Sequence, residues 1–393
     1  MISLGTLATI VILLGVAALF ARLAAEAGLP PAGAIMLVGI SAGGILPHAL
    51  TIELRPGVLA VFLPALIFEA AWDIDARVLR RVAGAIAVLA LPGTLLTAMA
   101  IAAAATVGGL QAGPAFVLGA ILSATDPVAV LALFRRLRIP PELFTIVEGE
   151  SIANDGVAAV LVIALVPLAA TWWSTAGAGA VFLRMLMMSI GGIAAGVGVA
   201  LAATPVLRAT RFSFLRIVVT LGVAYGAYAL AAFFGASGIL ASAAAGVALP
   251  AIALGDGARD VERFWDRVAI AANALVFLLT GLSLRLERIF HEPLLLAAIV
   301  LAVVASRAFL AFVLVPLKVP AAARAGWRGA IALAGVRGGL SLALALGLPA
   351  DFPGRASILD AVFAVVFLTV VVQGWILEPV LRRLILEERP RAA

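Results

Sequence analysis

The 393-residue sequence contains no cysteine, two histidines and two tyrosines. Without cysteine the chain forms no disulfide and offers no thiolate ligand, and without a histidine cluster no transition-metal site is expected. Charge is also scarce, because 12% of the residues are charged while 64% are hydrophobic and the mean hydropathy is +1.21. So few charges do not cover the surface of a water-soluble protein. The composition therefore predicts an all-α polytopic membrane protein.

A window of about 20 residues, the length that crosses roughly 30 Å of hydrocarbon, places thirteen spans along the chain. They centre near residues 13, 39, 65, 95, 123, 155, 190, 224, 244, 272, 304, 337 and 369. No basic stretch precedes the first apolar run, which favours a spanning helix over a cleaved signal peptide.

The basic residues are distributed unevenly between the two sides that this count defines. Twenty of the 27 lysines and arginines lie in loops assigned to the cytoplasm, and four, Arg55, Arg285, Arg288 and Arg355, lie in outer loops. The positive-inside rule then predicts a protein of the cell (inner) membrane with its N-terminus outside and its C-terminus in the cytoplasm. His48 and His291 fall in outer loops, where we expect them to be solvated. The net charge of +6 is therefore a topology signal, and no nucleic-acid partner is expected.

Thirteen spans divide into two groups of six that flank span seven and begin on opposite sides of the membrane. This is the inverted-repeat plan of secondary transporters, with residues 1–170, a linking helix at 176–207, and residues 211–384 in a single transmembrane unit. Corresponding spans are interrupted: Asp126 precedes Pro127 in span five, and glycines flank Arg337 in span twelve, at Gly335, Gly338 and Gly339. We expect the two breaks to cross, with Asp126 near helix N-termini and Arg337 near helix C-termini.

Four ionisable side chains reach the predicted midplane: Asp155, Asp126, Glu69 and Arg337. Ionisable residues inside a membrane are costly and are functional candidates by default. In span six, Glu148, Ser151 and Asp155 share one helical face, while Glu150 and Asn154 form an i, i+4 pair on a neighbouring face. These carboxylates, the Ser151 hydroxyl and free carbonyls at an unwound Thr125 are oxygen ligands that suit a hard monovalent cation.

Five segments occur in order along the chain: ATDPVAV (124–130), EGESIANDGVA (148–158), GASGILA (235–241), ANALVFLLTGLSL (272–284) and GVRGGLS (335–341). Together they resemble the monovalent cation:proton antiporter-1 family, which includes sodium/proton antiporters and exchangers. The resemblance implies a secondary active sodium/proton antiporter and not an enzyme, with lithium able to replace sodium and no cofactor besides the transported ions.

The resemblance also implies roles for individual residues. Asp155 would exchange the cation for a proton, and the sodium ion would lie among Asp155, Asp126, Ser151, Thr125 and Glu69. Asn154 would order the site, and Glu150 would form a structural ion pair with Arg337. Arg307 matches an arginine of family members, and Glu148 is a further accessory candidate. Family members place a glutamate where this chain has Ala232, which puts any role of that carboxylate in doubt.

The resemblance further implies a homodimer. Spans one to three and seven to ten would form a static scaffold, and spans four to six and eleven to thirteen a moving core. The neutral Asn154 favours exchange of one cation for one proton, because an aspartate there would add a second titrating group. The chain ends about ten residues after the last predicted span, so no cytosolic regulatory domain is expected.

Several alternatives stay open at the level of the sequence. The transported cation could be potassium, because ion choice depends on cavity size and ligand number. A cation channel would use the same ligands, although no repeated filter sequence is present. An intramembrane aspartyl protease would use Asp126 and Asp155 as a dyad, although no Gly-x-Gly-Asp stretch flanks either aspartate. Asp126 could also serve only to satisfy free amides, and Glu69 only to line a polar crevice.

Overall fold

The computed structural model describes residues 4–27, 31–45, 56–168, 178–210, 212–250, 259–284, 292–317 and 321–386. All regular structure within these ranges is helical, which confirms the predicted fold class. Six of the described helices are long and apolar enough to cross a membrane, and shorter apolar helices accompany them. The count of thirteen spans and the inverted repeats stay predictions. His48, His291, Arg55, Arg285 and Arg288 lie outside the described residues.

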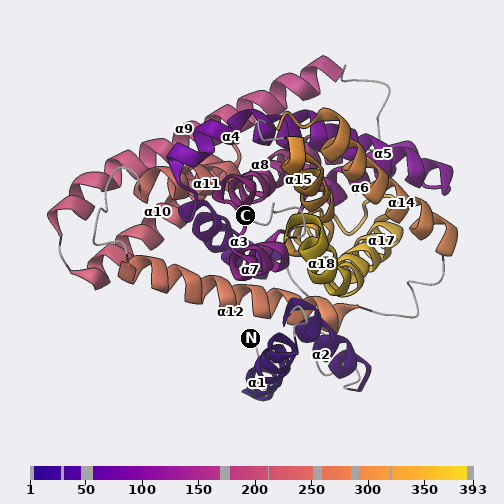
Figure 1. Ribbon diagram of the computed structural model, residues 1–393, viewed down its shortest axis with the longest axis horizontal. Coiled ribbons are helices and arrows are strands. Elements are labelled where there is room, and N and C mark those ends of the chain that lie inside the picture. The colour runs from indigo at the N-terminus through magenta and orange to yellow at the C-terminus, as the bar shows by residue number, and fades with distance from the viewer. Residues whose placement is uncertain are drawn as a thin grey trace.

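The helices pack into two bundles. The first bundle consists of α1 (Leu4–Glu26), α2 (Pro31–Ile45), α3 (Pro56–Trp72), α9 (Ala178–Ala209), α10 (Ser213–Phe233), α11 (Gly238–Leu249) and α12 (Arg259–Ser283). In Figure 1, α9 runs along the upper edge from the left, α10 lies at the left, and α12 crosses the lower part of the view above α1 and α2. One hydrophobic cluster, centred on Phe68 and Trp265, joins buried residues of α3, α9, α10, α11 and α12 only.

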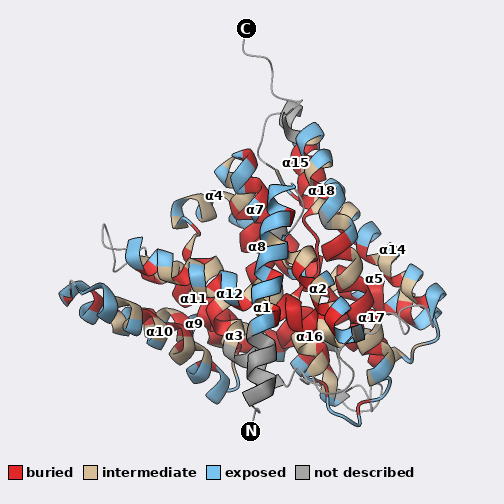
Figure 2. Ribbon diagram, turned by 90° about the horizontal axis from the view of Figure 1, so that it is seen from below, coloured by how far each residue is buried: buried red, intermediate tan, exposed pale blue. Residues whose placement is uncertain are grey.

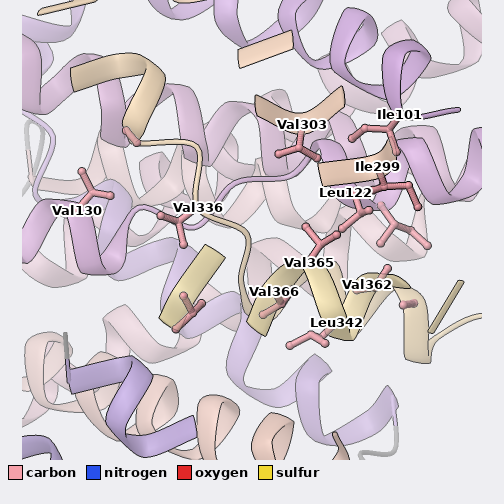
Figure 3. Close-up of a cluster of buried hydrophobic side chains, with 14 of the residues drawn as sticks. Ile101, Leu122, Val130, Ile299, Val303, Val336, Leu342, Val362, Val365 and Val366 are labelled. Atoms are coloured by element: carbon pink, nitrogen blue, oxygen red, sulfur yellow. The ribbon is translucent and has the colours of Figure 1, made fainter. Parts of the chain in front are cut away.

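The second bundle carries both interrupted helices. It consists of α4 (Ala76–Val88), α5 (Thr94–Val107), α6 (Ala112–Ser123), α7 (Val128–Leu137), α8 (Pro141–Leu165), α14 (Pro293–Phe309), α15 (Ala321–Leu333), α16 (Gly339–Leu346), α17 (Arg355–Phe367) and α18 (Gly374–Leu381). Figure 3 shows part of its hydrophobic core, where Leu122, Val336 and Leu342, which flank the two breaks, belong to the same buried cluster as Val303 and Val365.

A smaller hydrophobic cluster forms the boundary between the bundles. Ile67 and Ala71 of α3 pack there with Ile152 and Ala158 of α8, and Ala124 of the α6–α7 break belongs to the same cluster. The boundary therefore passes directly beside the break that carries Asp126.

Small residues bring helix backbones close together. A Cβ added at Gly281 of α12 would lie 2.2 Å from the Met36 carbonyl oxygen of α2, and one at Gly196 of α9 would lie 2.1 Å from the Ala241 carbonyl oxygen of α11. Lipid tails are as apolar as leucine, so helices in a membrane associate largely through such close packing. These contacts hold the first bundle together.

Several helices contain wide π-type turns, which the sequence analysis did not anticipate. One such turn, Leu89–Gly93, links α4 to α5 and accommodates Pro92, which has no backbone N–H to donate. Another, Leu368–Gln373, follows α17 and places Thr369 against the break before α16. The outer faces are apolar: Phe182, Met187 and Ile190 of α9 are each more than half exposed, as expected for a surface that meets lipid (Figure 2).

Candidate functional site

The two interrupted helices cross at their breaks. Helix α6 ends at Ser123 and α7 begins at Val128, while α15 ends at Leu333 and α16 begins at Gly339. The Asp126 amide donates a hydrogen bond of 2.8 Å to the Val336 carbonyl, so the extended segments are joined directly. This confirms the predicted crossing. The reason is local: Pro127 and the glycines around Arg337 disfavour continuous helix at these two points.

Opposite charges stabilise the exposed helix ends, as predicted. The Asp126 carboxylate accepts hydrogen bonds from the Val128 amide at 3.1 Å and the Gly339 amide at 3.4 Å, which are the first amides of α7 and α16. The Arg337 guanidinium donates to the carbonyls of Ala124, at 3.1 Å, and Ser123, at 3.5 Å, at the end of α6. Arg337 is fully buried, and this contact neutralises the partial negative charge of a helix C-terminus.

The predicted ion pair between Glu150 and Arg337 is wrong in its partner. Glu150 of α8 instead binds Arg307 of α14 in a bidentate pair, with both N–O distances 2.8 Å. The Arg307 Nε also donates to the Ile331 carbonyl at 3.0 Å. Arg337 is occupied by the α6 carbonyls, so the second arginine in this region supplies the counter-charge. The close approach of Arg307 requires a small residue at 335, since a Cβ on Gly335 would lie 3.0 Å from the Arg307 Cγ.

Asn154 connects this ion pair to the α6–α7 break. Its side-chain amide donates 2.7 Å hydrogen bonds to Glu150 Oε1 and Thr125 Oγ1, and its side-chain oxygen accepts from the Thr125 amide at 3.3 Å. Thr125 is also held by Ser151, whose hydroxyl donates to the Thr125 carbonyl at 2.6 Å. Residues 150, 151 and 154 of α8 thereby fix the unwound segment.

Asp155 differs from its neighbours because part of its carboxylate has no partner. Among the described residues, its Oδ1 atom is buried and makes no hydrogen bond. Asp155 lines a cavity of about 640 Å³ that Thr125, Asp126, Ser151 and Glu69 also line. Glu148, Ser151 and Asp155 all face this cavity, which confirms that they share one face of α8. A buried polar atom without a partner is costly, so this oxygen is the natural place for a proton or a cation.

The cavity also brings in polar side chains that the sequence analysis did not select. Asp266 and Asn273 of α12 line it. Arg135 of α7 also lines it, and it is one of the twenty basic residues that the span count assigns to cytoplasmic loops. Asp266 and Asn273 are seven residues apart, so they share one helical face, and this spacing was a signal in the sequence. Glu69 lies closest to Asp73 and Asp266, since one oxygen of each carboxylate lies within 4.8 Å of those of the other two.

Comparisons with known proteins show the family to which the chain belongs. The family described as sodium/hydrogen exchanger, transmembrane, matches residues 10–383. This chain belongs to the sodium/hydrogen exchanger family. Membership confirms the resemblance to cation:proton antiporters and makes the protein a membrane transporter and not an enzyme. The aspartyl protease alternative is therefore excluded.

Relatives of this sodium/hydrogen exchanger family member cover most of its length. The Na(+)/H(+) antiporter NhaS2 of Synechocystis sp. is 32% identical over 392 residues, which cover 95% of this chain and 70% of that protein. The Na(+)/H(+) antiporter NhaH of Halobacillus dabanensis is 32% identical over 350 residues, 83% of each chain. The structure of the sodium proton antiporter MjNhaP1 from Methanocaldococcus jannaschii at pH 8 aligns with a TM-score of 0.77 and 20% identity, over 94% of this chain and 98% of that one. This likeness supports the fold.

One expected departure from other family members lies outside the site. Ala232, at the position where the resemblance implies a glutamate, is an exposed residue near the end of α10, and it does not line the cavity of Asp155.

Proposed function

We propose that this chain is a secondary active antiporter that exchanges sodium for protons at Asp155. The observation that supports this most is the buried, unpartnered Oδ1 atom of Asp155 in the cavity beside the crossing. A carboxylate in a poorly hydrated site is satisfied either by a proton or by a cation. Because one group serves both, the two species compete, and carrying each to the opposite side gives antiport.

The ligands around Asp155 suit sodium. The Ser151 hydroxyl, the Thr125 carbonyl and the Asp126 carboxylate line the same cavity, and Glu69 lines it farther toward the ends of α3 and α7. All are oxygen ligands of the kind that hard cations prefer. Sodium is favoured because the relatives named above are Na(+)/H(+) antiporters. Lithium would use the same ligands, and potassium is the alternative cation.

The stoichiometry that fits the site is one cation for one proton. Glu150 is neutralised by Arg307, and Asn154 is neutral and engaged with both Glu150 and Thr125. The Asp126 carboxylate is held by two backbone amides. Asp155 is then the group that exchanges its partner, so each loaded state carries the same charge. The empty, charged site would cross the membrane less readily than either loaded form.

Transport would proceed by movement of the second bundle against the first. One hydrophobic cluster lies within the first bundle. The large cluster of the second bundle also takes in buried residues of α1, α2, α9 and α12, and a smaller cluster lies beside the α6–α7 break, so apolar contacts without directional bonds make up much of the boundary. The first bundle would hold the homodimer together. The end of the molecule that carries Arg135 and Arg136 would face the cytoplasm of a cell (inner) membrane, in keeping with the arginine distribution. Such an exchanger would serve pH and sodium homeostasis.

The deciding experiment measures dissipation of a pH gradient in proteoliposomes on addition of sodium, lithium or potassium, with the membrane potential either clamped or free. The site variant is Asp155→Asn. The matched control is Asp351→Asn, which makes the same change at an exposed residue.

We expect sodium and lithium to collapse the gradient in the wild type and in Asp351→Asn, at a rate that clamping does not change, and Asp155→Asn to be inactive. Equal activity of Asp155→Asn would contradict the assignment of the site. A rate that depends on the membrane potential would contradict the one-to-one exchange. Cation flux without proton movement would favour a channel.

A further inference from the structure

A cluster of carboxylates lies beside the cavity, near the C-terminal ends of α3 and α7. Glu69 and Asp73 come from the end of α3, and Asp266 comes from α12. One oxygen of each carboxylate lies within 4.8 Å of those of the other two. Arg135 of α7 is bonded to Asp73, so the three ionised carboxylates and this arginine leave two negative charges. We call these three carboxylates the mouth cluster.

A fourth carboxylate beside the cluster lacks a partner. Glu148 of α8 is 1% exposed, and among the described residues its Oε2 atom is buried and makes no hydrogen bond. It lines the same cavity as Glu69 and Asp266. Glu148 and the carboxylates of Glu69 and Asp266 repel one another across this cavity when they are ionised, so a ligand of positive charge would stabilise the whole group.

We propose that the mouth cluster, with Glu148 facing it, is a binding site for a divalent cation of the size of Ca²⁺. Calcium binds oxygen ligands at 2.3–2.6 Å, so two ligands on opposite sides of the ion lie about 4.6–5.2 Å apart. In the mouth cluster, one oxygen of each carboxylate lies within 4.8 Å of those of the other two, which is close enough for all three oxygens to bind one such ion. Magnesium usually keeps several water ligands and binds one or two carboxylates, so a site with several carboxylates favours calcium.

Charge also separates this site from that of the transported ion. When their carboxylates are ionised, the mouth cluster and Glu148 together with Arg135 carry three negative charges, so a divalent cation neutralises more of this charge than a monovalent one does, whereas the Asp155 site requires a single positive charge. The mouth site lies on the route between Asp155 and the ends of α3 and α7, because both line one cavity. If the proposed function holds, a bound divalent cation obstructs sodium there and slows exchange. Binding itself does not depend on transport.

Two tryptophans make the site measurable. Trp72 precedes Asp73, and Trp265 precedes Asp266, with Phe68 between them at ring-centroid distances of 5.6 Å and 4.7 Å. A Tb³⁺ ion, which takes oxygen ligands as Ca²⁺ does, would be excited through these rings when it occupies the site. The purified full-length protein is therefore titrated with TbCl₃ under tryptophan excitation, and the emission is then competed with Ca²⁺ or with Na⁺.

We expect saturable Tb³⁺ emission that micromolar to millimolar Ca²⁺ displaces at concentrations at least tenfold lower than those of Na⁺. Asp266→Asn and Asp73→Asn should each weaken Tb³⁺ binding at least tenfold. Asp155→Asn and the exposed Asp351→Asn should leave it unchanged, and size-exclusion profiles report whether each variant is folded.

Three results would overturn the proposal. Emission that none of the variants alters would mean adventitious binding at the surface. Emission lost in Asp155→Asn would place Tb³⁺ at the transport site. Displacement by Na⁺ as readily as by Ca²⁺ would make the mouth cluster a passage for the transported ion alone. The competition between Ca²⁺ and Na⁺ uses the wild-type protein, so it tests the proposal even if a variant fails to fold. Because the readout is emission, a failure here leaves the proposed function standing, and the transport assay tests that function separately.

Discussion

The Glu150 carboxylate accepts three buried hydrogen bonds, two from Arg307 and one from Asn154. Removing one partner of a buried ion pair leaves an uncompensated charge and typically costs about 3–5 kcal/mol. We therefore expect Arg307→Gln to lower the thermal stability of the purified protein strongly. The double variant Glu150→Gln/Arg307→Gln should recover much of the loss, because it removes both charges.

The control for this prediction is the double variant in which Arg337, in place of Arg307, is substituted together with Glu150. In the structure Arg337 binds the α6 carbonyls and not Glu150, so Glu150→Gln/Arg337→Gln should show no recovery over the single variants. Thermal unfolding followed by tryptophan fluorescence measures all of them. If the double variant with Arg337 recovers thermal stability and the one with Arg307 does not, Glu150 pairs with Arg337, as the resemblance implied.

Gly338 tests how closely the two breaks must approach. A Cβ at this position would lie 1.9 Å from Asp126 Oδ2, so Gly338→Ala must displace the carboxylate or the start of α16. We expect exchange to fall on the order of tenfold to a hundredfold, as misplacement by about 1 Å does at active sites. Gly222→Ala in α10, where a Cβ would meet nothing within 4 Å, should transport normally in the same proteoliposome assay. Equal rates for both variants would show that the crossing tolerates a side chain.

Residue spacing predicted part of the site well. The face shared by Glu148, Ser151 and Asp155 follows from helical periodicity, which is local, and the structure has all three on the cavity. The partner of Glu150 does not follow from spacing, because Arg307 is 157 residues away and only the packing of α14 against the site brings it near. Arg307 and Arg337 are both buried, and the sequence alone does not show which of them lies closer to Glu150.

At the scale of elements, the two breaks depend on a third helix. Thr369, in the widened turn after α17, accepts a 3.1 Å hydrogen bond from the Arg337 amide. Thr369→Val would leave this buried amide without a partner, at a cost of about 1–3 kcal/mol. We expect lower thermal stability together with slower exchange, since the loss falls on the α15–α16 break.

Thr106→Val provides the matched control. The Thr106 hydroxyl bonds only the Ala102 carbonyl one turn earlier in α5, so its removal leaves no buried amide unpaired. Little change in stability or exchange is expected. If both threonine variants behave alike, Thr369 does not support the crossing.

Proline and glycine positions explain why the breaks were predictable and why the widened turn after α17 was not. Pro127 and the glycines around Arg337 disfavour helix through their own backbone geometry, so the sequence marks those points. The turn at Leu368–Gln373 contains neither proline nor glycine. Its shape depends on the contact of Thr369 with a segment of a different helix, which no local pattern encodes.

At the scale of the whole molecule, two neighbouring ion pairs distinguish movement between the bundles from movement within one. Arg135 of α7 binds Asp73 at the end of α3, so this pair joins the second bundle to the first. The adjacent Arg136 lies 3.4 Å from Glu378 of α18, and both belong to the second bundle. If the second bundle moves as a unit, the first contact must break in each cycle and the second stays intact.

The natural absence of cysteine allows a direct test of this movement. Cysteine pairs replace Asp73 and Arg135 in one variant and Arg136 and Glu378 in the other, and each pair is joined by a short, reducible bifunctional thiol reagent. We expect the link at 73 and 135 to stop sodium/proton exchange until it is reduced, because it fixes the boundary between the bundles. The link at 136 and 378 should leave exchange at the rate of the same variant without reagent. Inhibition by both links would mean that α7 and α18 also move apart, and the second bundle would then not be a rigid unit.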